Sequence, residues 1–141
     1  MEAGSTGAFS SNGMYVPENA RVAAQRLLAA DPDADDAAIM ALAGDMTVVT
    51  RARGEALCEQ ADPSDALFIL VSGRAIAVYR DPATGEGRIV GQIAHGEPIG
   101  EMGILTGEPR STGVICWRDA RLLRLDRPAF LRLALLSGRE R

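Results

Sequence analysis

An acid and an arginine, Glu101 and Arg110, flank a short glycine-bounded segment within residues 96–113, which read GEPIGEMGILTGEPRSTG. Apolar runs typical of β-strands precede and follow this segment. A guanidinium presents planar N–H donors that match a phosphate edge, and a carboxylate accepts a hydrogen bond from a hydroxyl. Together the two groups could hold one phosphate and one sugar hydroxyl inside an apolar barrel. The rest of the sequence favours a small-molecule sensor over an enzyme.

Short β-branched runs begin after Gly44 and continue almost to the C-terminus. Turn-forming residues such as Asp62-Pro63-Ser64 and His95-Gly96 separate them. Many short strands at such intervals indicate a sandwich, a jelly roll or a barrel. The pattern predicts strands over residues 46–50, 66–72, 74–80, 88–93, 113–117 and 121–125.

Two helices are predicted before the strands. Pro17 stands where the first could begin, and this helix stops at Asp31-Pro32 because a proline disfavours helical backbone in the residue before it. Asp33 can cap the second helix, and Gly44 ends it. The apolar faces come from Val22, Leu27 and Leu28 in the first helix and from Ile39, Met40 and Leu42 in the second.

The two ends of the chain differ in pattern. Residues 1–16 are rich in glycine, serine and asparagine and show no period, which predicts a disordered leader or a linker. Residues 127–137 predict an amphipathic helix with Pro128 in its first turn. The predicted organisation is a leader over 1–16, helices over 17–44, a β-roll over 45–126 and a C-terminal helix over 127–141.

The composition limits the classes of function. The chain has 141 residues, enough for about one domain with its own core. Its formal net charge of −4 disfavours non-specific binding to nucleic acid or to an anionic membrane. No apolar run approaches the ~20 residues that span a bilayer, so we expect no membrane segment in this chain. The basic residues other than the single histidine are all arginine, which together with abundant alanine indicates a GC-rich bacterial genome.

Several reactive or aromatic residues are interpreted as structural. Cys58 and Cys116 lack the spacing of a metal-binding pair. We favour two buried free thiols in a reducing cytosol, and a disulfide between them is the alternative. His95 is predicted to be a solvated turn residue. Trp117 and Tyr79 are predicted to pack in or on the barrel rather than stack on a base.

The arginine-rich run 118–127, in which charges alternate with leucines, predicts an edge strand and a turn with solvated arginines. It is not expected to bind nucleic acid directly. A Ser-His-Asp triad could be assembled on paper, but the chain has no G-x-S-x-G nucleophile motif. We therefore expect no catalytic residues, no metal and no cofactor.

The segment Gly100-Glu101-Met102-Gly103-Ile104-Leu105, followed by Pro109-Arg110-Ser111-Thr112, resembles the phosphate-binding cassette of the cyclic-nucleotide-binding domain family. Catabolite activators and the regulatory subunits of protein kinase A carry domains of this type. Gly54-Glu55, Gly73 and residues 61–70 also match in type and order, so that the resemblance covers about residues 44–137. It implies a mainly β fold, an antiparallel β-jelly roll (double-stranded β-helix), with N-terminal helices and a short C-terminal helix.

The resemblance also implies a role for each cassette residue. Arg110 would pair with the exocyclic oxygens of the cyclic phosphate, and Glu101 would accept a hydrogen bond from the ribose 2′-hydroxyl. Ser111 would add a hydroxyl donor, and a short helix opened by Gly100 and Glu101 would direct backbone N–H groups at the phosphate. The implied ligand-binding set is Gly100, Glu101, Met102, Gly103, Arg110, Ser111 and Thr112, and Val90, Ile99 and Leu105 are candidates for an apolar pocket wall.

Two positions depart from the family pattern. Ile99 stands where an aromatic residue is usual, and Gly113 stands where threonine or valine is common. The family's long closing helix is also missing after residues 127–141, so we expect a lid from these residues, from a partner or from sequence outside this chain.

The implied function is regulatory: the domain would sense cAMP, placed slightly ahead of cGMP, and would transmit occupancy to an effector by moving the flanking helices. The effector domain is expected outside this chain, in the cytoplasm or on the cytosolic side of a membrane protein, and a homodimer stays open. One alternative is a degenerate module of the same fold that binds no nucleotide. Another is the regulatory part of a larger bacterial phospholipase or transporter. A surface salt bridge between Glu101 and Arg110 is the plainest alternative.

Overall fold

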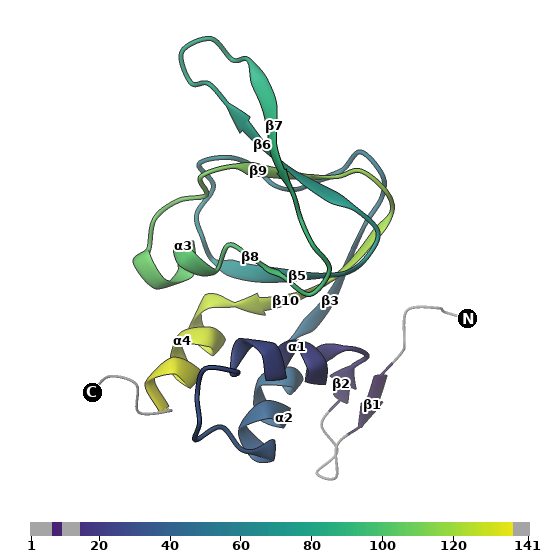
Figure 1. The fold of residues 1–141 in the computed structure, drawn as a ribbon, viewed down its shortest axis with the longest axis vertical. Coiled ribbons are helices and arrows are strands. Elements are labelled where there is room, and N and C mark those ends of the chain that lie inside the picture. Colours follow the sequence, from purple (N-terminus) through teal and green to yellow (C-terminus); the bar gives the residue numbers. More distant parts are fainter. Residues whose placement is uncertain (1–6, 10–14, 137–141) are drawn as a thin grey trace. The chain divides into compact units, whose positions relative to one another are not determined.

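The computed structural model describes residues 7–9 and 15–136 of the chain, which divides into two compact units. The β unit takes residues 49–124, and the helical unit takes residues 1–48 and 125–141. The chain passes between the units within strands β3 (Thr47–Arg51) and β10 (Ala120–Asp126). Figure 1 labels the elements of each unit.

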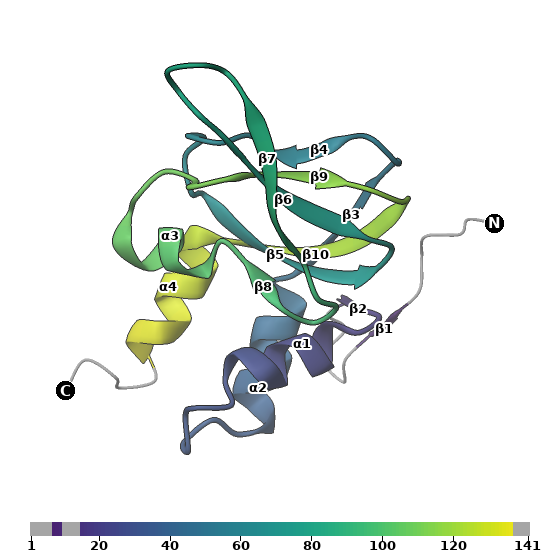
Figure 2. The same cartoon turned by 45° about the horizontal axis from the view of Figure 1, so that its top comes forward.

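Strands β3 to β10 form two four-stranded sheets (Figures 1 and 2). One sheet has the order β3-β10-β5-β8, and the other has the order β4-β9-β6-β7. Strand pairs β5–β8, β4–β9, β6–β7 and β6–β9 are antiparallel. This is the antiparallel jelly roll that the sequence predicts. The remaining bounds are β4 Ala56–Cys58, β5 Ala66–Ser72, β6 Ala75–Arg80, β7 Gly87–Gln92, β8 Pro98–Ile99 and β9 Gly113–Cys116.

Apolar side chains from both sheets form one core cluster. It contains Phe68 and Leu70 from β5, Ile99 from β8, and Val114 and Cys116 from β9, all buried. Burying such side chains provides the main stabilisation of the roll. Because β8 and β9 are both anchored in this core, it also fixes the two ends of the segment between them, residues 100–112, which contains helix α3 (Glu101–Thr106).

The six predicted strands are present, with ends that differ by one residue at most. The prediction of an edge strand within residues 118–127 is wrong, because β10 lies between β3 and β5 in its sheet. Its leucines explain this position: Leu122, Leu123 and Leu125 are all buried. Sequence analysis missed β4 and β8, which have three and two residues and are too short to show a period.

The helical unit contains α1 (Ala20–Leu27), α2 (Asp36–Gly44) and α4 (Arg127–Leu136). Helix α1 begins later than predicted, because Pro17 ends strand β2 (Tyr15–Pro17) and Asn19, at φ +73°, precedes the helix. The buried face of α1 consists of alanines, and Val22 of the predicted apolar stripe is exposed.

Helix α2 is capped by Asp35 and not by Asp33. The side chain of Asp35 accepts a hydrogen bond from the backbone N–H of Ala38 at 2.9 Å. The backbone N–H of Asp33 instead donates to Oδ1 of Asp31 at 3.0 Å, which holds Asp33 in the preceding turn. The cap is therefore two residues further along than predicted.

Much of the predicted disordered leader, residues 1–6 and 10–14, lies outside the described residues, as do residues 137–141 of the predicted C-terminal segment. Within the described part, β1 (Gly7–Phe9) pairs antiparallel with β2. These short segments are therefore regular strands, contrary to the prediction of disorder. None of the described helices is long and apolar enough to cross a bilayer.

Candidate ligand-binding site

A cavity of about 470 Å³ opens in the β unit beside α3. The seven residues of the predicted ligand-binding set all line it: Gly100, Glu101, Met102, Gly103, Arg110, Ser111 and Thr112. Of the three predicted wall residues, Ile99 lines the cavity, but Val90 and Leu105 do not and are 47% and 49% exposed. The structure thus gathers the cassette around one cavity and leaves two of the wall candidates outside its lining.

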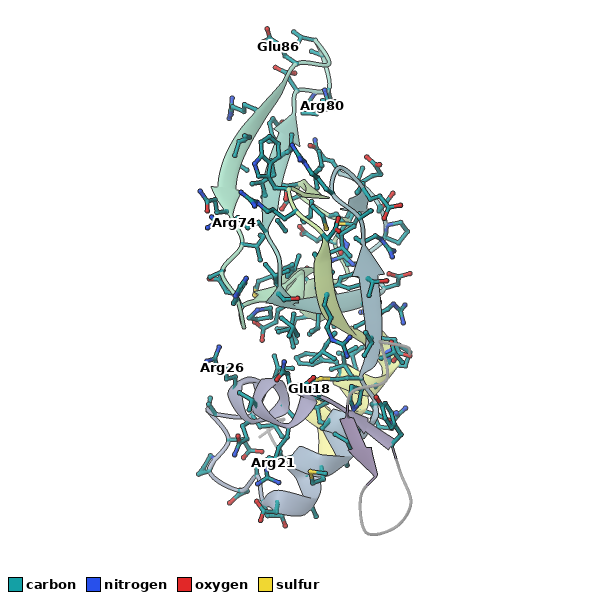
Figure 3. All side chains as sticks on the ribbon, turned by 90° about the vertical axis from the view of Figure 1, so that its right-hand side faces the viewer. Glu18, Arg21, Arg26, Arg74, Arg80 and Glu86 are labelled. Carbon is teal, nitrogen blue, oxygen red and sulfur yellow. The ribbon has the colours of Figure 1, made fainter. Side chains whose placement is uncertain are left out.

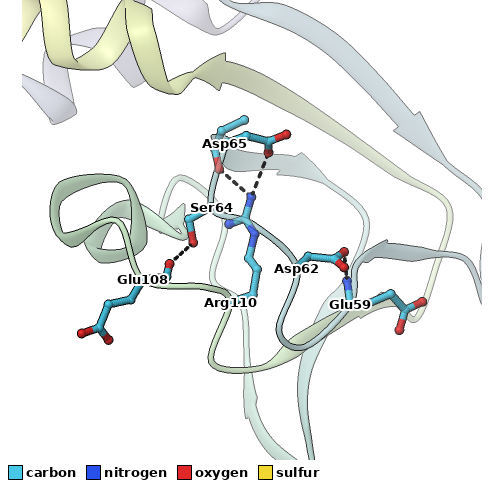
Figure 4. Close-up of polar contacts among 7 residues, drawn as sticks. Glu59, Asp62, Ser64, Asp65, Glu108 and Arg110 are labelled. Atoms are coloured by element: carbon cyan, nitrogen blue, oxygen red, sulfur yellow. Dashed lines mark hydrogen bonds and ion pairs between the residues drawn. The ribbon is translucent and has the colours of Figure 1, made fainter.

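Arg110 is the buried cation of this cavity, with a side chain only 5% exposed. Its Nη2 donates to the backbone oxygen of Ala66 at 2.6 Å and lies 4.0 Å from Oδ1 of the largely exposed Asp65 (Figure 4). The guanidinium carbon is 5.6 Å from the centre of the Phe68 ring. Nε and Nη1 find no hydrogen-bond partner among the described residues. Buried donors without partners are costly, so these N–H groups are suited to an anion that enters the cavity.

The loop before β5 holds the backbone of Arg110. The Arg110 N–H donates to the backbone oxygen of Asp62 at 2.8 Å, and the Ala61 N–H donates to the backbone oxygen of Arg110 at 2.8 Å. Oδ2 of Asp62 accepts from the backbone N–H of Glu59 at 2.9 Å, which stabilises the loop itself (Figure 4). Ala61 adopts φ +74°, in the left-handed region that a side chain disfavours. The position of the guanidinium therefore depends on this loop as well as on the cassette.

Two glycines of the cassette have no room for a side chain. Gly100 has φ +88°, and a Cβ built there would overlap Nη1 of Arg110. A Cβ at Gly103 would overlap Oγ of Ser64, which donates to the backbone oxygen of Glu108 at 2.6 Å. The glycines thus permit the close approach of Arg110 and of the loop before β5 to α3.

Glu101 and Arg110 reach the cavity from different elements, α3 and the loop that follows it. Glu101 is half-buried, and no ion pair joins it to Arg110 within the part of the chain that the structure describes. Ser111 is exposed and Thr112 is half-buried, and both line the cavity. The lining of the cavity therefore combines one buried cation with two carboxylates, Glu101 and Glu108, and with hydroxyl and apolar neighbours.

Cys58 and Ser64 line the cavity but were not predicted to do so. Both cysteines are free, as favoured, although Cys58 is only half-buried whereas Cys116 is buried. Burial raises the pKa of the Cys58 thiol, and the positive charge of Arg110 opposes that shift in part. Cys58 reaches the cavity because β4 pairs with β9 in a register that sets it opposite Val114. Such a register is not visible in a single sequence.

A second hollow of about 480 Å³ lies over β6, β7 and the end of β9. Trp117 and Ile89 line it and are both more than half exposed. Nε2 of the exposed His95 lies 2.8 Å from the backbone oxygen of Gly73, to which it can donate. Arg74 also lines this hollow and lies at the surface of the unit in Figure 3. Among the described residues, no group of acidic, cysteine or histidine side chains suited to a metal ion occurs in either hollow.

The cassette segment beside a cavity and the jelly roll are typical of regulatory domains, and sequence comparison identifies the family. Residues 48–136, more than half of the chain, match the cyclic nucleotide-binding domain. The chain belongs to this family.

The relatives carry this domain within longer proteins. Lysophospholipase NTE1 of Lodderomyces elongisporus is 35% identical over 81 residues, which are 55% of this chain and 6% of that protein. NTE family protein Mb2594 of Mycobacterium bovis is 35% identical over 69 residues, which are 49% of this chain and 11% of that protein. The chain therefore spans a small part of these relatives.

The fold also matches solved structures. The regulatory domain of Toxoplasma gondii PKA, crystallised with cAMP, superposes with a TM-score of 0.71 at 20% sequence identity. The match covers 86% of this chain and 48% of that one. At this level of identity the match shows the shared fold.

Proposed function

We propose that this chain is a regulatory domain that binds a cyclic nucleotide, with cAMP slightly ahead of cGMP. The observation that carries the proposal is the buried guanidinium of Arg110 at a cavity of about 470 Å³, because its Nε and Nη1 have no partner among the residues that the structure describes. A cavity of this size falls within the range of ordinary small-ligand sites, roughly 300–1,000 Å³.

Each cassette group has a place in the proposed complex. The unpaired N–H groups of Arg110 donate to exocyclic oxygens of the cyclic phosphate in charge-assisted hydrogen bonds. Glu101 accepts a hydrogen bond from the ribose 2′-hydroxyl, and Ser111 donates to the phosphate. Gly100 keeps the backbone close to Arg110, because a side chain there would occupy the position of Nη1.

The two plainer alternatives fit the contacts less well. A salt bridge between Glu101 and Arg110 would satisfy the arginine, but the nearest acid among the described residues is Asp65, at 4.0 Å and with a side chain 75% exposed. A degenerate module has no use for a buried cation with free donors, since such a group lowers the stability of the empty fold. Both considerations favour an anionic ligand.

The output of the domain is proposed from its relatives. Because the matching proteins include a lysophospholipase, we infer that the chain is the regulatory part of a larger phospholipase at the cytosolic side of a membrane. A transporter and a homodimeric arrangement stay as alternatives. Ligand binding would shift the population of conformations in the flanking helices α1, α2 and α4. The rate of amide hydrogen exchange in these helices should change when the nucleotide is added. An unchanged rate would contradict the proposal that ligand binding is transmitted to the helices.

Isothermal titration with cAMP and with cGMP tests the binding directly. Arg110→Gln should weaken binding by roughly ten- to hundredfold or more, because a hydrogen bond to a charged group contributes about 1.5–3 kcal/mol. Arg74→Gln is the matched control, since it removes the same charge from the second hollow and should bind as the unaltered chain does. Equal affinity in Arg110→Gln, from a folded protein with an unchanged circular dichroism spectrum, would contradict the assignment.

A further inference from the structure

Cys58 is a nucleophile at the cavity that the proposed function does not use. It ends β4, lines the cavity and packs against the core cluster with its half-buried side chain. The chain's other thiol, Cys116, is buried within the same core. The two cysteines therefore differ in access, because Cys58 lines the cavity and Cys116 is buried.

The same cavity contains an independent sign that it takes an anion. Arg110 is its single cationic lining residue, and its side chain is 5% exposed with Nε and Nη1 unpaired among the described residues. A small acidic molecule that reaches Cys58 would thus find a buried guanidinium in the same space. The fixed positive charge also opposes part of the rise that burial causes in the pKa of the Cys58 thiol.

We propose that Cys58 is a modification site for small acidic disulfides, and that the mixed disulfide formed there excludes the cyclic nucleotide. The exclusion of the cyclic nucleotide by this mixed disulfide rests on the proposed function. In the reaction, the Cys58 thiol loses its proton to solvent and its sulfur attacks one sulfur of the disulfide. A new S–S bond forms, the old S–S bond breaks, and the other half leaves as a thiolate that takes up a proton. The attached half carries its carboxylates into the space beside Arg110.

The environment of Cys58 predicts slow exchange that depends on the state of the cavity. Burial is the main influence and raises the pKa of the thiol, with smaller contributions in the same direction from Asp62 and Glu59. Arg110 lowers the pKa and so offsets part of this effect. A phosphate paired with Arg110 would cancel that offset and block access, so the nucleotide should protect Cys58.

The test uses the full chain and two probes of opposite charge, glutathione disulfide and cystamine. Mass spectrometry of the peptides then reports the rate of mixed-disulfide formation at each cysteine separately. Cys58 should react ahead of Cys116, and the acidic probe should react about tenfold or more faster than the basic one, as expected for a contribution of at least about 1.5 kcal/mol from a charged hydrogen bond. Arg110→Gln should abolish the preference, and Arg74→Gln should retain it.

Two further measurements couple the modification to the ligand. Saturating cAMP should suppress the reaction of Cys58, and chains modified at Cys58 should fail to bind cAMP until dithiothreitol removes the adduct. Equal rates at the two cysteines, a preference for cystamine, or binding of cAMP to modified chains would each overturn the proposal. These outcomes need no variant, so they hold even if Arg110→Gln does not fold.

The two proposals fail in distinguishable ways. If calorimetry shows no cAMP binding while Cys58 still prefers the acidic probe, the modification site stands and the nucleotide assignment falls. If cAMP binds while Cys58 reacts no faster than Cys116, the modification site falls and the nucleotide assignment stands.

Discussion

The two hollows of the β unit have nearly the same volume, about 470 and 480 Å³, but their linings differ in kind. The first contains a buried arginine whose Nε and Nη1 lack partners in the described chain. In the second, Arg74 is exposed, and His95 already lies at hydrogen-bond distance from Gly73. Volume alone therefore does not distinguish the two. The difference is that burial in the first hollow leaves polar groups unsatisfied, and those groups define the ligand that would satisfy them.

Each hollow also contains a glycine at positive φ that has no room for a side chain. At Gly73 the obstacle is backbone, because a Cβ would overlap the backbone oxygen of Asp119 and lie 2.7 Å from Cα of Ala120. At Gly100 the obstacle is the side chain of Arg110. Substitution should therefore damage the fold at the second hollow and ligand binding at the first.

Gly73→Ala should have the largest effect of the series. Left-handed backbone costs a side chain about 1–2 kcal/mol, and overpacking against fixed backbone adds about 1–3 kcal/mol. We expect the free energy of unfolding in urea to fall by about 2–5 kcal/mol. Gly85→Ala, at φ +77° with nothing within 4 Å of its Cβ, is the control and should lose only the backbone contribution. Equal losses of unfolding free energy in both variants would mean that the overlap with Asp119 does not contribute to the destabilisation.

Gly100→Ala should cause the second-largest loss of stability in this series and the largest loss of cAMP affinity. The new methyl group must displace Arg110, so cAMP affinity should fall by about tenfold or more with the loss of a charged hydrogen bond. Urea unfolding should show a loss of about 2 kcal/mol, from the backbone conformation and from a side chain that can move. Gly54→Ala, at φ +89° and in open space, matches the backbone conformation and should leave titration with cAMP unchanged. Unaltered affinity in Gly100→Ala would break the proposed link between this glycine and the phosphate.

Ser64→Ala tests the loop that supports the first hollow. It removes the hydrogen bond from Oγ to the backbone oxygen of Glu108, which joins this loop to the segment after α3. The free energy of unfolding should fall by about 1 kcal/mol, the ordinary net contribution of such a bond. Ser72→Ala, at an exposed position that ends β5, is the control and should show no loss. A loss of stability no greater than that of the control would mean that this hydrogen bond does not support the cassette.

Ala61→Gly should have the smallest effect, and it should be stabilising. Ala61 has φ +74°, so glycine removes about 1–2 kcal/mol of backbone strain while losing about 0.5–1 kcal/mol to chain entropy. The net gain in urea unfolding should be about 0.5 kcal/mol. Ala83→Gly, in the exposed β6–β7 turn, lacks the positive φ and should be slightly destabilising. A destabilised Ala61→Gly variant would show that the loop relieves this strain by another route.

The cassette could be found from the sequence because its residues are contiguous and their spacing is fixed by one short helix. Leu105 shows the limit of that reasoning, since it follows the fully buried Ile104 on α3 and is therefore turned about 100° away around the helix axis. Val90 lies on β7, an edge strand whose pairing with β6 shifts register between Ala77 and Val78. Neither a helix rotation nor a register shift is readable from residue types alone.

The residues that complete the cavity arrive from other parts of the fold. Ser64 appeared in the sequence only as part of a turn, and Cys58 only as a buried thiol. Their places depend on strand pairing and on a loop that closes over the cassette, and both are consequences of tertiary structure. The strand pattern alone predicted a sandwich, a jelly roll or a barrel, and the resemblance of the cassette to a known family selected the jelly roll.

The unsatisfied donors of Arg110 have an evolutionary consequence. Buried N–H groups without partners make the empty fold less stable, by about 1–3 kcal/mol for each unsatisfied group. In a lineage that no longer encounters the anion, random substitution would therefore tend to remove the arginine while the roll persisted. Arg110 would then be the first position lost when a gene copy is released from its ligand, and its presence would distinguish sensing copies from silent ones in a survey of genomes.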